Sequence, residues 1–334
     1  MKIGLTADLH FDEHASMSSM RPSGLTTRLE DCLACWRWIV KTCVDNKCDR
    51  LMVLGDVFAS RTSIDLPVIH VVSDAFREAA EVIGLHIVTG NHDSYLRTPR
   101  INSTAMFKGV ATVWDEARWA TWPGGISLGI VPWTDDADLY AKNVKMVGER
   151  TYLFSHALLE GVTASGRGVP KAALRCDYFN RIFLGDVHDP KFIEPNIQYV
   201  GAPLQINYGD AGGKRGFFIL DTGKNSVEFI ENTISPRFHL LTDTKVDNVR
   251  EGDFVRVKTE DVQEAAEIVA ALQGKTEWIE NEAVEIDDAA PRLDVRSKDQ
   301  HDVVLQRYID HMGVKMFDAD ELLELGLDIL AEVK

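Results

Sequence analysis

The sequence predicts an α/β fold with a sheet that contains parallel strands, and two patterns in its 334 residues support this prediction. Short apolar runs suited to buried strands alternate with stretches of helical periodicity, so that two helix-like segments separate the first three runs. This β-α-β-α-β order is typical of parallel strands joined by crossover helices. Later apolar runs are linked by short turns, which predicts antiparallel pairs as well.

The larger part of the chain, residues 1–235, is expected to be one domain. Its first three strands are expected at residues 3–8, 51–56 and 85–89. Between them, apolar residues from Leu29 to Val44 follow the 3.6-residue period of a helix, and a second helix is expected at residues 67–83. Further strands are expected at residues 126–131, 152–155, 182–184, 198–200, 217–220 and 227–230.

Two smaller regions follow. Residues 236–290 are expected to form a capping domain, with a strand at 254–258, a helix at 260–272, a second strand at 277–286 and a linker near 287–291. A unit of this size is marginal on its own. Residues 291–334 are expected to be a helical tail. Apolar residues nearly encircle its last helix, so some of them need a cover from elsewhere.

The negative charge is concentrated near the end of the chain. The chain has 36 basic and 52 acidic side chains, a formal net charge of −16, of which −12 falls on residues 245–334. Modules that bind nucleic acid are usually basic. A nucleic acid substrate would therefore have to be held by a local patch, by metal ions or by a partner protein.

Composition also bears on location. No apolar stretch approaches the ~20 residues that span a bilayer, which argues against a membrane protein. The first strand begins beside the initiator Met, which leaves no room for a secretory leader. The five cysteines are odd in number, and four lie within residues 32–48, where buried packing thiols are expected rather than disulfides or a zinc site. We therefore expect a cytoplasmic protein.

Five of the predicted strands end in side chains able to bind a hard or borderline metal ion. These ends carry Asp8-Leu9-His10, Asp56, Asn91-His92-Asp93, His156 and Asp186-Val187-His188. Because the carboxyl ends of parallel strands meet at one edge of a sheet, these distant side chains should converge. A lone Asp-x-His motif is usually an ordinary surface feature, but five such ends in order favour a site.

The spacing of these residues supports a shared site. In each Asp-x-His pair the two side chains are two residues apart, so both should point to the same face of a strand. The glycines before Asp56, Asn91 and Asp186 are expected to permit the sharp turn that leaves each strand. Seven oxygen and nitrogen ligands are too many for one tetrahedral ion and suit two ions about 3.5–4 Å apart.

These motifs resemble those of the calcineurin-like metallophosphoesterases, which have D-x-H, G-D, G-N-H-D, a lone His and G-H-x-H in that order. The match covers residues 1–190. The resemblance implies a sandwich of two mixed β-sheets flanked by helices, followed by the small α+β capping domain and the helical tail. Within the superfamily the chain resembles the SbcD-type nuclease subunits, on Gly55-Asp56-Val57-Phe58, residues 156–161 and residues 201–217.

The resemblance also implies a role for each matching side chain. One metal ion would be held by Asp8, His10, Asp56 and His188, and the other by Asp56, Asn91, His156 and Asp186. Asp56 would bridge the two ions. His92 would face the leaving oxygen as a general acid without binding metal.

Two positions depart from the family pattern. Asp186 stands where the family has the first His of G-H-x-H, and the added oxygen ligand favours Mn²⁺ or Mg²⁺ over Zn²⁺. Ala59 stands three places after Asp56, where the family often has Asp or His. Any support for His92 must then come from another group, and His14 and Arg61 are the two candidates.

Two stretches near the expected site carry basic side chains and no acidic ones. Their candidate DNA-binding residues are Tyr95, Arg97, Arg100 and Lys108 in residues 94–108, and Arg167 and Lys171 in residues 161–175. Either stretch could contact a DNA backbone through charge. The alternative is that both are ordinary solvated loops.

The resemblance implies an SbcD-like, Mn²⁺-dependent DNA exonuclease and endonuclease that acts in recombination, repair or replication. Its partner would be an SbcC-like ATPase, docked on the helical tail, and a homodimer is left open. The alternative is a phosphomonoesterase or nucleotide phosphodiesterase that acts alone on the same metal centre. A third alternative, a scaffold with a degenerate site, is disfavoured by the complete ligand set.

Overall fold

The computed structural model describes residues 1–95, 101–163, 168–259, 261–276 and 278–281, together with three single helical positions at 303, 306 and 323. The chain divides into two compact units, Met1–Ala283 and Val284–Lys334. Apart from those three positions, all of the described residues belong to the first unit. The expected linker and the rest of the expected helical tail lie outside the described residues.

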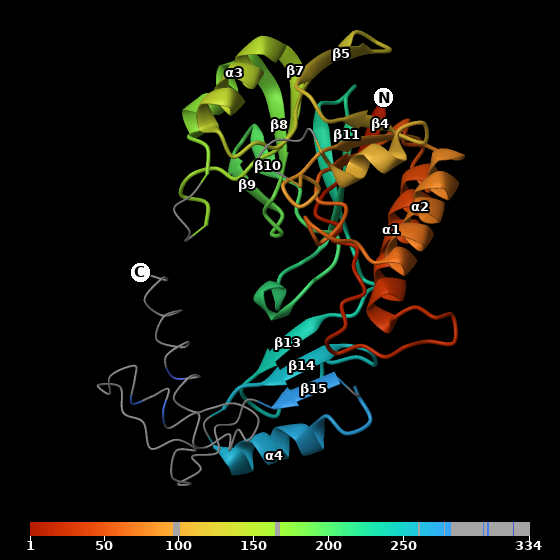
Figure 1. The fold of residues 1–334 in the computed structure, drawn as a ribbon, viewed down its shortest axis with the longest axis vertical. Helices are drawn as coiled ribbons and strands as arrows, with labels where there is room; N and C mark the ends of the chain where they lie inside the picture. The colour runs from red at the N-terminus through yellow and green to blue at the C-terminus, as the bar shows by residue number, and fades with distance from the viewer. Residues whose placement is uncertain are drawn as a thin grey trace. The chain divides into compact units, whose positions relative to one another are not determined.

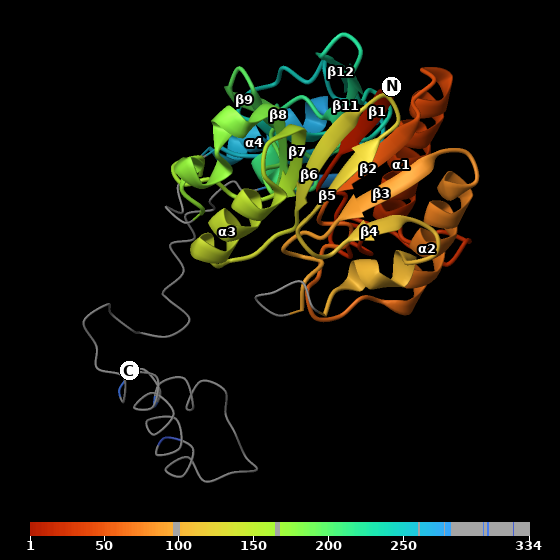
Figure 2. The same ribbon diagram turned by 90° about the horizontal axis from the view of Figure 1, so that it is seen from above.

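Two six-stranded mixed sheets form the body of the first unit. Figure 1 and Figure 2 show how the two sheets are arranged. The first sheet has the order β12-β11-β1-β2-β3-β4, with bounds Ser226–Glu231, Gly216–Asp221, Lys2–Thr6, Arg50–Leu54, Gly84–Val88 and Thr112–Trp114. The second has the order β5-β6-β7-β8-β10-β9, with bounds Arg118–Trp122, Ile126–Val131, Arg150–His156, Phe179–Gly185, Ile197–Tyr199 and Lys191–Glu194. The expected sandwich of two mixed sheets is confirmed.

Helices cover the outer faces of this sandwich. The α-helices are α1 (Thr27–Asp45), α2 (Leu66–Ala80), α3 (Ala137–Val147) and α4 (Val262–Ala271), and short 3₁₀ turns lie at Ser103–Phe107, Lys171–Leu174, Cys176–Tyr178 and Tyr208–Asp210. In Figure 2, α1 and α2 lie outside the first sheet and α3 lies outside the second. Among the described residues, no helix combines the length and the apolar content needed to span a membrane.

The strands at the centre are buried on both faces. Along β2, Met52 and Leu54 pack into the core between the two sheets. Leu51 and Val53 point the other way and pack against α1 and α2. This double burial explains why such strands read as continuous apolar runs. Within the first sheet β1 to β4 are parallel, and within the second β6, β7, β8 and β10 are parallel.

Each strand expected in residues 1–235 is present within three residues of its expected bounds, but several elements were missed. The missed elements are β4, β5, β9, β13 and α3. The half-exposed strand β5 lies at a sheet edge and shows no continuous apolar run. In α3 only Tyr140, Val144 and Val147 are buried, a helical spacing that is too short a pattern to stand out in the sequence.

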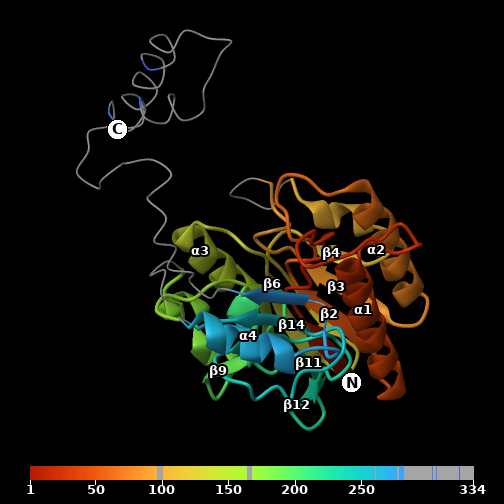
Figure 3. The same cartoon turned by 90° about the horizontal axis from the view of Figure 1, so that it is seen from below.

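A third, three-stranded sheet follows the sandwich. Its strands β13 (Phe238–Leu241), β14 (Phe254–Val257) and β15 (Trp278–Asn281) are all parallel. Helix α4 covers this sheet, as Figure 3 shows from below. The expected strand, helix and strand are present, with β13 as an addition. The part of the last expected strand beyond residue 281 lies outside the described residues.

The cysteines lie as packing thiols. All five are free, and Cys32, Cys35 and Cys43 are buried along α1. Burial raises the pKa of the Cys32 thiol to about 12, which keeps it protonated and poorly suited to bind zinc.

Asp253, which precedes β14, links β13 and the residues before it to the turn before β14. Its buried carboxylate accepts hydrogen bonds from the backbone N–H of Arg237 at 2.9 Å and of Arg250 at 3.0 Å, and it contacts His239 Nε2 at 2.9 Å. Burial opposes ionisation, but these contacts outweigh it and hold the pKa of Asp253 below its usual value.

We expect Asp253→Ala to lower the free energy of unfolding by about 1.5–3 kcal/mol, the usual contribution of hydrogen bonds to a charged group. Asp243→Ala, on an exposed carboxylate beside Lys245, is the control and should leave the free energy of unfolding nearly unchanged. Because the folded-state pKa of Asp253 is depressed, its stabilisation is complete above the unfolded-state pKa of about 3.9 and is lost as pH falls through the folded-state value. Urea unfolding at pH 7 and at successively lower pH checks both expectations. Equal losses in the two variants at pH 7 would contradict this account.

Candidate metal centre

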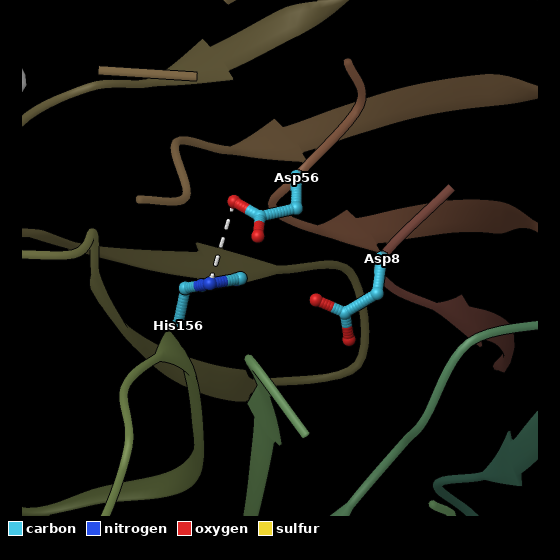
Figure 4. Close-up of side chains that lie close together, drawn as sticks. All are labelled: Asp8, Asp56 and His156. Carbon is cyan, nitrogen blue, oxygen red and sulfur yellow. Dashed lines mark ion pairs between the residues drawn. The ribbon is translucent and has the colours of Figure 1, made fainter. Parts of the chain in front are cut away.

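The ends of β1, β2 and β3 in the first sheet meet the ends of β7 and β8 in the second. His156 is the last residue of β7, and the other predicted ligands lie on the segments that follow β1, β2, β3 and β8. At the centre are Asp8, Asp56 and His156, whose ligand atoms all lie within 4.8 Å of one another. Figure 4 shows the three side chains pointing toward a common space. His156 Nε2 lies 3.5 Å from Asp56 Oδ1, and all three residues are buried.

Burial makes the charges of this trio unfavourable in the absence of a counter-ion. It raises the pKa of Asp8 to about 7, although His156 acts in the opposite direction, and it also raises the pKa of Asp56. Burial would lower the pKa of His156, but Asp56 and Asp186 outweigh it and hold that pKa above its ordinary value. A divalent cation would supply the charge that these buried carboxylates lack, so the donor set fits a metal ion.

The other four predicted ligands surround this trio. His10 Nε2 lies 3.8 Å from Asp56 Oδ2, and His188 Nε2 lies 3.2 Å from His10 Nε2. On the opposite side, Asn91 Oδ1 and Asp186 Oδ1 lie 3.0 Å and 3.6 Å from His156 Nε2. The structure thus brings all seven side chains together, in two groups on either side of Asp56. Their role as metal ligands stays a prediction.

We expected Asp8 and His10, and likewise Asp186 and His188, to lie on one face of a strand, and this expectation was wrong. β1 ends at Thr6 and β8 at Gly185, so neither pair lies on a strand. The backbone turns instead, with φ of +53° at Asp8, +47° at His10 and +92° at Asp186, and the same conformation recurs at Asp56 with +56°. Such conformations cost roughly 1–3 kcal/mol each in non-glycine residues and cluster at functional sites.

The expected role of the glycines was right at one position of three. Gly55 has φ of +89°, as a sharp turn requires, whereas Gly90 and Gly185 do not adopt a positive φ. Gly90 and Gly185 instead lack a Cβ atom where the side chains of Asp56 and His156 pack closely. A Cβ atom at Gly90 would lie 2.2 Å from Asp56 Oδ1, and one at Gly185 would lie 2.7 Å from His156 Nδ1.

Asp93 was not predicted as a site residue, yet it fixes the loops that carry the ligands. Its buried carboxylate accepts hydrogen bonds from the backbone N–H groups of Asp56 at 2.8 Å, Val57 at 2.9 Å and Gly90 at 2.8 Å. Burial, followed by the charge of Asp56, raises the pKa of Asp93 to about 6. The one available signal was its place at the end of the Gly-Asn-His-Asp motif.

His92 lies beside the ligands and is held by the loop that follows Asp56. Its backbone N–H donates to Asp56 Oδ1 at 2.8 Å, and its ring Nδ1 lies 2.5 Å from the carbonyl oxygen of Ala59. A carbonyl only accepts, so Nδ1 must carry the proton and donate it. The support that a side chain at position 59 would give comes here from the backbone of the same residue.

Neither candidate for that support takes the role. His14 Nε2 lies 3.1 Å from the carbonyl oxygen of His10. The guanidinium of Arg61 lies 5.2 Å from the ring centroid of Trp133. Among the described residues, the backbone of Ala59 is therefore the group that orients His92.

Asp210 was also missed as a site residue, although it lies within residues 201–217, which carry part of the resemblance. It lies 3.3 Å from His188 Nδ1 and accepts from Arg215 at 3.1 Å and from the backbone of Ile206 at 2.7 Å. Burial opposes ionisation of Asp210, but His188 foremost among these contacts lowers its pKa to about 2. A carboxylate in this position fixes the orientation of a ligating imidazole.

The candidate DNA-binding residues are only partly described. Tyr95 is exposed, whereas Lys108 is paired with Asp115 at 2.7 Å and Lys171 is paired with Glu194. Arg97, Arg100 and Arg167 lie outside the described residues. The assignment of these six residues to DNA contacts stays a prediction.

Comparison with known proteins agrees with this geometry. The pattern of the calcineurin-like phosphoesterases matches residues 1–199, and the chain belongs to that family. It is therefore a metal-dependent phosphoesterase, a hydrolase of a family whose cofactor is a pair of divalent metal ions. The resemblance drawn from the strand-end motifs is confirmed.

Individual relatives are more distant. The chain is 24% identical over 209 residues to exonuclease subunit 1 of Enterobacteria phage T4, a match that spans 58% of this chain and 59% of that protein. Solved structures with similarity include TT1561 of Thermus thermophilus, with a TM-score of 0.43 and 11% identity, covering 69% of this chain and 98% of that one. Another is the nuclease MPE of Pseudomonas putida, with a TM-score of 0.32 and 14% identity, covering 68% and 87%.

Proposed function

We propose that the protein is an SbcD-like, Mn²⁺-dependent DNA exonuclease and endonuclease subunit that hydrolyses phosphodiester bonds in recombination, repair or replication. The observation that carries the proposal is the convergence of seven oxygen and nitrogen ligands about Asp56, with His92 beside them. The similarity to a phage exonuclease subunit supports DNA as the substrate. The cytoplasm is the compartment in which this substrate and the five free thiols belong.

The mechanism assigns a task to each group around the site. Two divalent ions, held by the seven ligands, would neutralise charge on the phosphate and lower the pKa of an attacking water. Asp56 lies between the two groups of ligands and would belong to both. With Nδ1–H donating to the Ala59 carbonyl, His92 would act as the acid in its imidazolium form, whose Nε2–H could pass to the departing sugar oxygen and leave the neutral ring.

Ligand chemistry supports Mn²⁺ or Mg²⁺ over Zn²⁺ as the native metal. Asp8, Asp56 and Asp186 supply three carboxylates, and Asn91 adds an amide oxygen. Oxygen-rich sets favour Mn²⁺ or Mg²⁺, whereas Zn²⁺ prefers nitrogen and sulfur.

A partner is part of the proposal. Residues 245–334 carry a net charge of −12 and would repel DNA. An SbcC-like ATPase docked on the helical tail would supply the DNA-binding surface that this region lacks. A homodimer would present two copies of that surface.

One observation favours the alternative, a phosphomonoesterase or nucleotide phosphodiesterase that acts alone. A cavity of about 710 Å³ adjoins the site, and Asn91 and Asp186 contribute to its lining. This volume falls within the roughly 300–1,000 Å³ typical of sites for small molecules.

A single assay separates the two functions. The purified chain is incubated with Mn²⁺ and labelled linear DNA, and in parallel with p-nitrophenyl phosphate and bis-p-nitrophenyl phosphate. We expect cleavage of DNA and of the diester, loss of both after chelation by EDTA, and stronger recovery with Mn²⁺ than with Zn²⁺. Hydrolysis of the small esters alone, with DNA intact even when the ATPase is added, would establish the alternative instead.

A further inference from the structure

Two cysteines lie together at the turn that follows α1. The backbone N–H of Cys48 donates to the carbonyl of Cys43 at 2.9 Å, and inside this bond the N–H of Lys47 donates to the carbonyl of Val44, also at 2.9 Å. Together with φ of +57° at Lys47, these two bonds form a Schellman motif. In this motif the side chains of the first and last residues commonly pack together. Here they are Cys43 and Cys48, whose thiols hydrogen-bond to each other.

The two thiols have different surroundings. Cys43 is fully buried, and a Cβ atom at Gly4 of β1 would clash with its sulfur. Cys48 is half-buried, so part of its surface is open to solvent. The ammonium of Lys2 lies at the same turn, where it donates to the carbonyl of Asn46 at 3.2 Å. One thiol is therefore open to reagents beside a cation, and the other is enclosed by the core.

These surroundings favour a thiolate at Cys48. The hydrogen bond from the Cys43 thiol lowers the pKa of Cys48 most strongly. Burial acts in the opposite direction, while the charge of Lys2 lowers this pKa and that of Asp49 raises it. The same hydrogen bond, followed by burial, raises the pKa of Cys43, which therefore keeps its proton. The thiolate is the form of cysteine that reacts as a nucleophile.

We propose that Cys43 and Cys48 are a redox-active pair that a hydroperoxide converts into a disulfide. With hydrogen peroxide, the Cys48 sulfur first attacks one oxygen, the O–O bond breaks, and a sulfenic acid and one water form. The Cys43 sulfur then attacks the Cys48 sulfur, and the hydroxyl group leaves with the Cys43 proton as a second water. In total the two thiols lose two electrons and two protons, and the peroxide is reduced to two waters.

The turn already holds the pair as a disulfide requires. Two cysteines can be bridged only when their Cα atoms lie within about 7 Å and their side chains point toward each other. The backbone hydrogen bond between Cys48 and Cys43 keeps the two residues close, and the contact between their thiols shows that the side chains converge. Disulfides in reducing compartments are usually transient and redox-sensing. A disulfide here would protect Cys48 from the irreversible sulfinic and sulfonic acids.

The other cysteine pair of α1 is an internal control. Cys32 and Cys35 are three residues apart, and both are buried. Burial raises the pKa of Cys32 to about 12 and also raises the pKa of Cys35. Neither thiol offers a thiolate or an exposed surface, so this pair should stay reduced under conditions that oxidise the pair at the turn.

Peptide mapping of the full chain tests the proposal, because Lys47 separates the two cysteines of the turn. The chain is treated with a small excess of hydrogen peroxide in EDTA, alkylated in denaturant and digested with trypsin without reduction. Cleavage after Lys41, Lys47 and Arg50 should release residues 42–47 joined to residues 48–50 by a disulfide. Thiol titration in denaturant should show the loss of two of the five thiols, and dithiothreitol should restore both.

The same digest contains the control. The peptide of residues 29–37 carries Cys32 and Cys35, and both should be recovered in the alkylated form. Full alkylation of Cys43 and Cys48 after peroxide treatment would overturn the proposal. Oxidation of the control pair to the same extent would overturn it as well, because the geometry of the turn would then confer nothing.

Two variants assign the order of the steps. In Cys43→Ala, Cys48 has no thiol to resolve it, so dimedone should trap its sulfenic acid, and prolonged treatment should give a sulfinic acid that dithiothreitol does not reverse. In Cys48→Ser, Cys43 should stay reduced because it is buried. Circular dichroism checks the fold of both variants, and the wild-type peptide map decides the proposal if either fails to fold. Rapid oxidation of Cys43 in Cys48→Ser would overturn the assignment of Cys48 as the attacking thiol.

Discussion

Replacing His92 by alanine is expected to lower the rate of DNA hydrolysis by about 10²–10⁴-fold, the usual contribution of a general acid. The sugar oxygen is a poor leaving group, so it needs a proton as the bond to phosphorus breaks. Because Nδ1–H donates to the Ala59 carbonyl, the proton would come from Nε2–H of the imidazolium form of His92, which leaves the neutral ring. Metal content should be unchanged, since the ring is not among the seven predicted ligands.

Substrates with different leaving groups make this expectation specific. A p-nitrophenolate departs readily as an anion, so His92→Ala should slow bis-p-nitrophenyl phosphate much less than DNA. Kinetics on both substrates and metal analysis by mass spectrometry measure this, with His70→Ala, on an exposed histidine beside Asp74, as the control. Turnover of DNA close to that of the wild type, or equal losses on the two substrates, would remove His92 from the role of acid.

The parts of the site that could be predicted are the Asp, Asn and His side chains at the ends of the predicted strands. The apolar runs before Asp8, Asp56 and His156 identify buried strands, and the parallel order of β1 and β2 brings Asp8 and Asp56 to one sheet edge. His156 comes from the second sheet, so the expectation of a single sheet edge was wrong, and the packing of the two sheets brings His156 to the other two residues. Edge elements such as β5 were missed because half-exposed strands lack an apolar run.

The parts that could not be predicted depend on backbone groups or on close packing. The Ala59 carbonyl is a property of every residue, so nothing in the sequence marks it as the support of His92. Asp93 acts through three backbone N–H groups, and Asp210 reaches His188 from a loop 22 residues away. Asp210 is an acidic residue that no motif marks, and Asp93 was marked only by its place at the end of the Gly-Asn-His-Asp motif.

The close packing at Gly90 leads to the second large effect. Gly90→Ala is expected to lower metal affinity and hydrolysis by about 10²-fold or more, the scale reached when a catalytic group is misplaced by about 1 Å. The added Cβ would lie 2.2 Å from Asp56 Oδ1 and 2.5 Å from the Asp56 backbone nitrogen. Asp56 cannot move away without breaking the hydrogen bond from its N–H to Asp93 or the one from the His92 N–H to its own carboxylate.

The methyl group must therefore either displace the Asp56 carboxylate or break the hydrogen bonds that Asp56 makes with Asp93 and His92. Titration with Mn²⁺ should show the lost affinity, and Gly223→Ala, in the exposed turn between β11 and β12 where the nearest atom is 3.3 Å from the new Cβ, should bind as the wild type does. Circular dichroism of both variants checks that the fold is kept. A Gly90→Ala protein that binds two equivalents of Mn²⁺ with wild-type affinity would show that Asp56 is not a ligand held in this position, because a carboxylate displaced by the methyl group cannot occupy the same place in the metal centre.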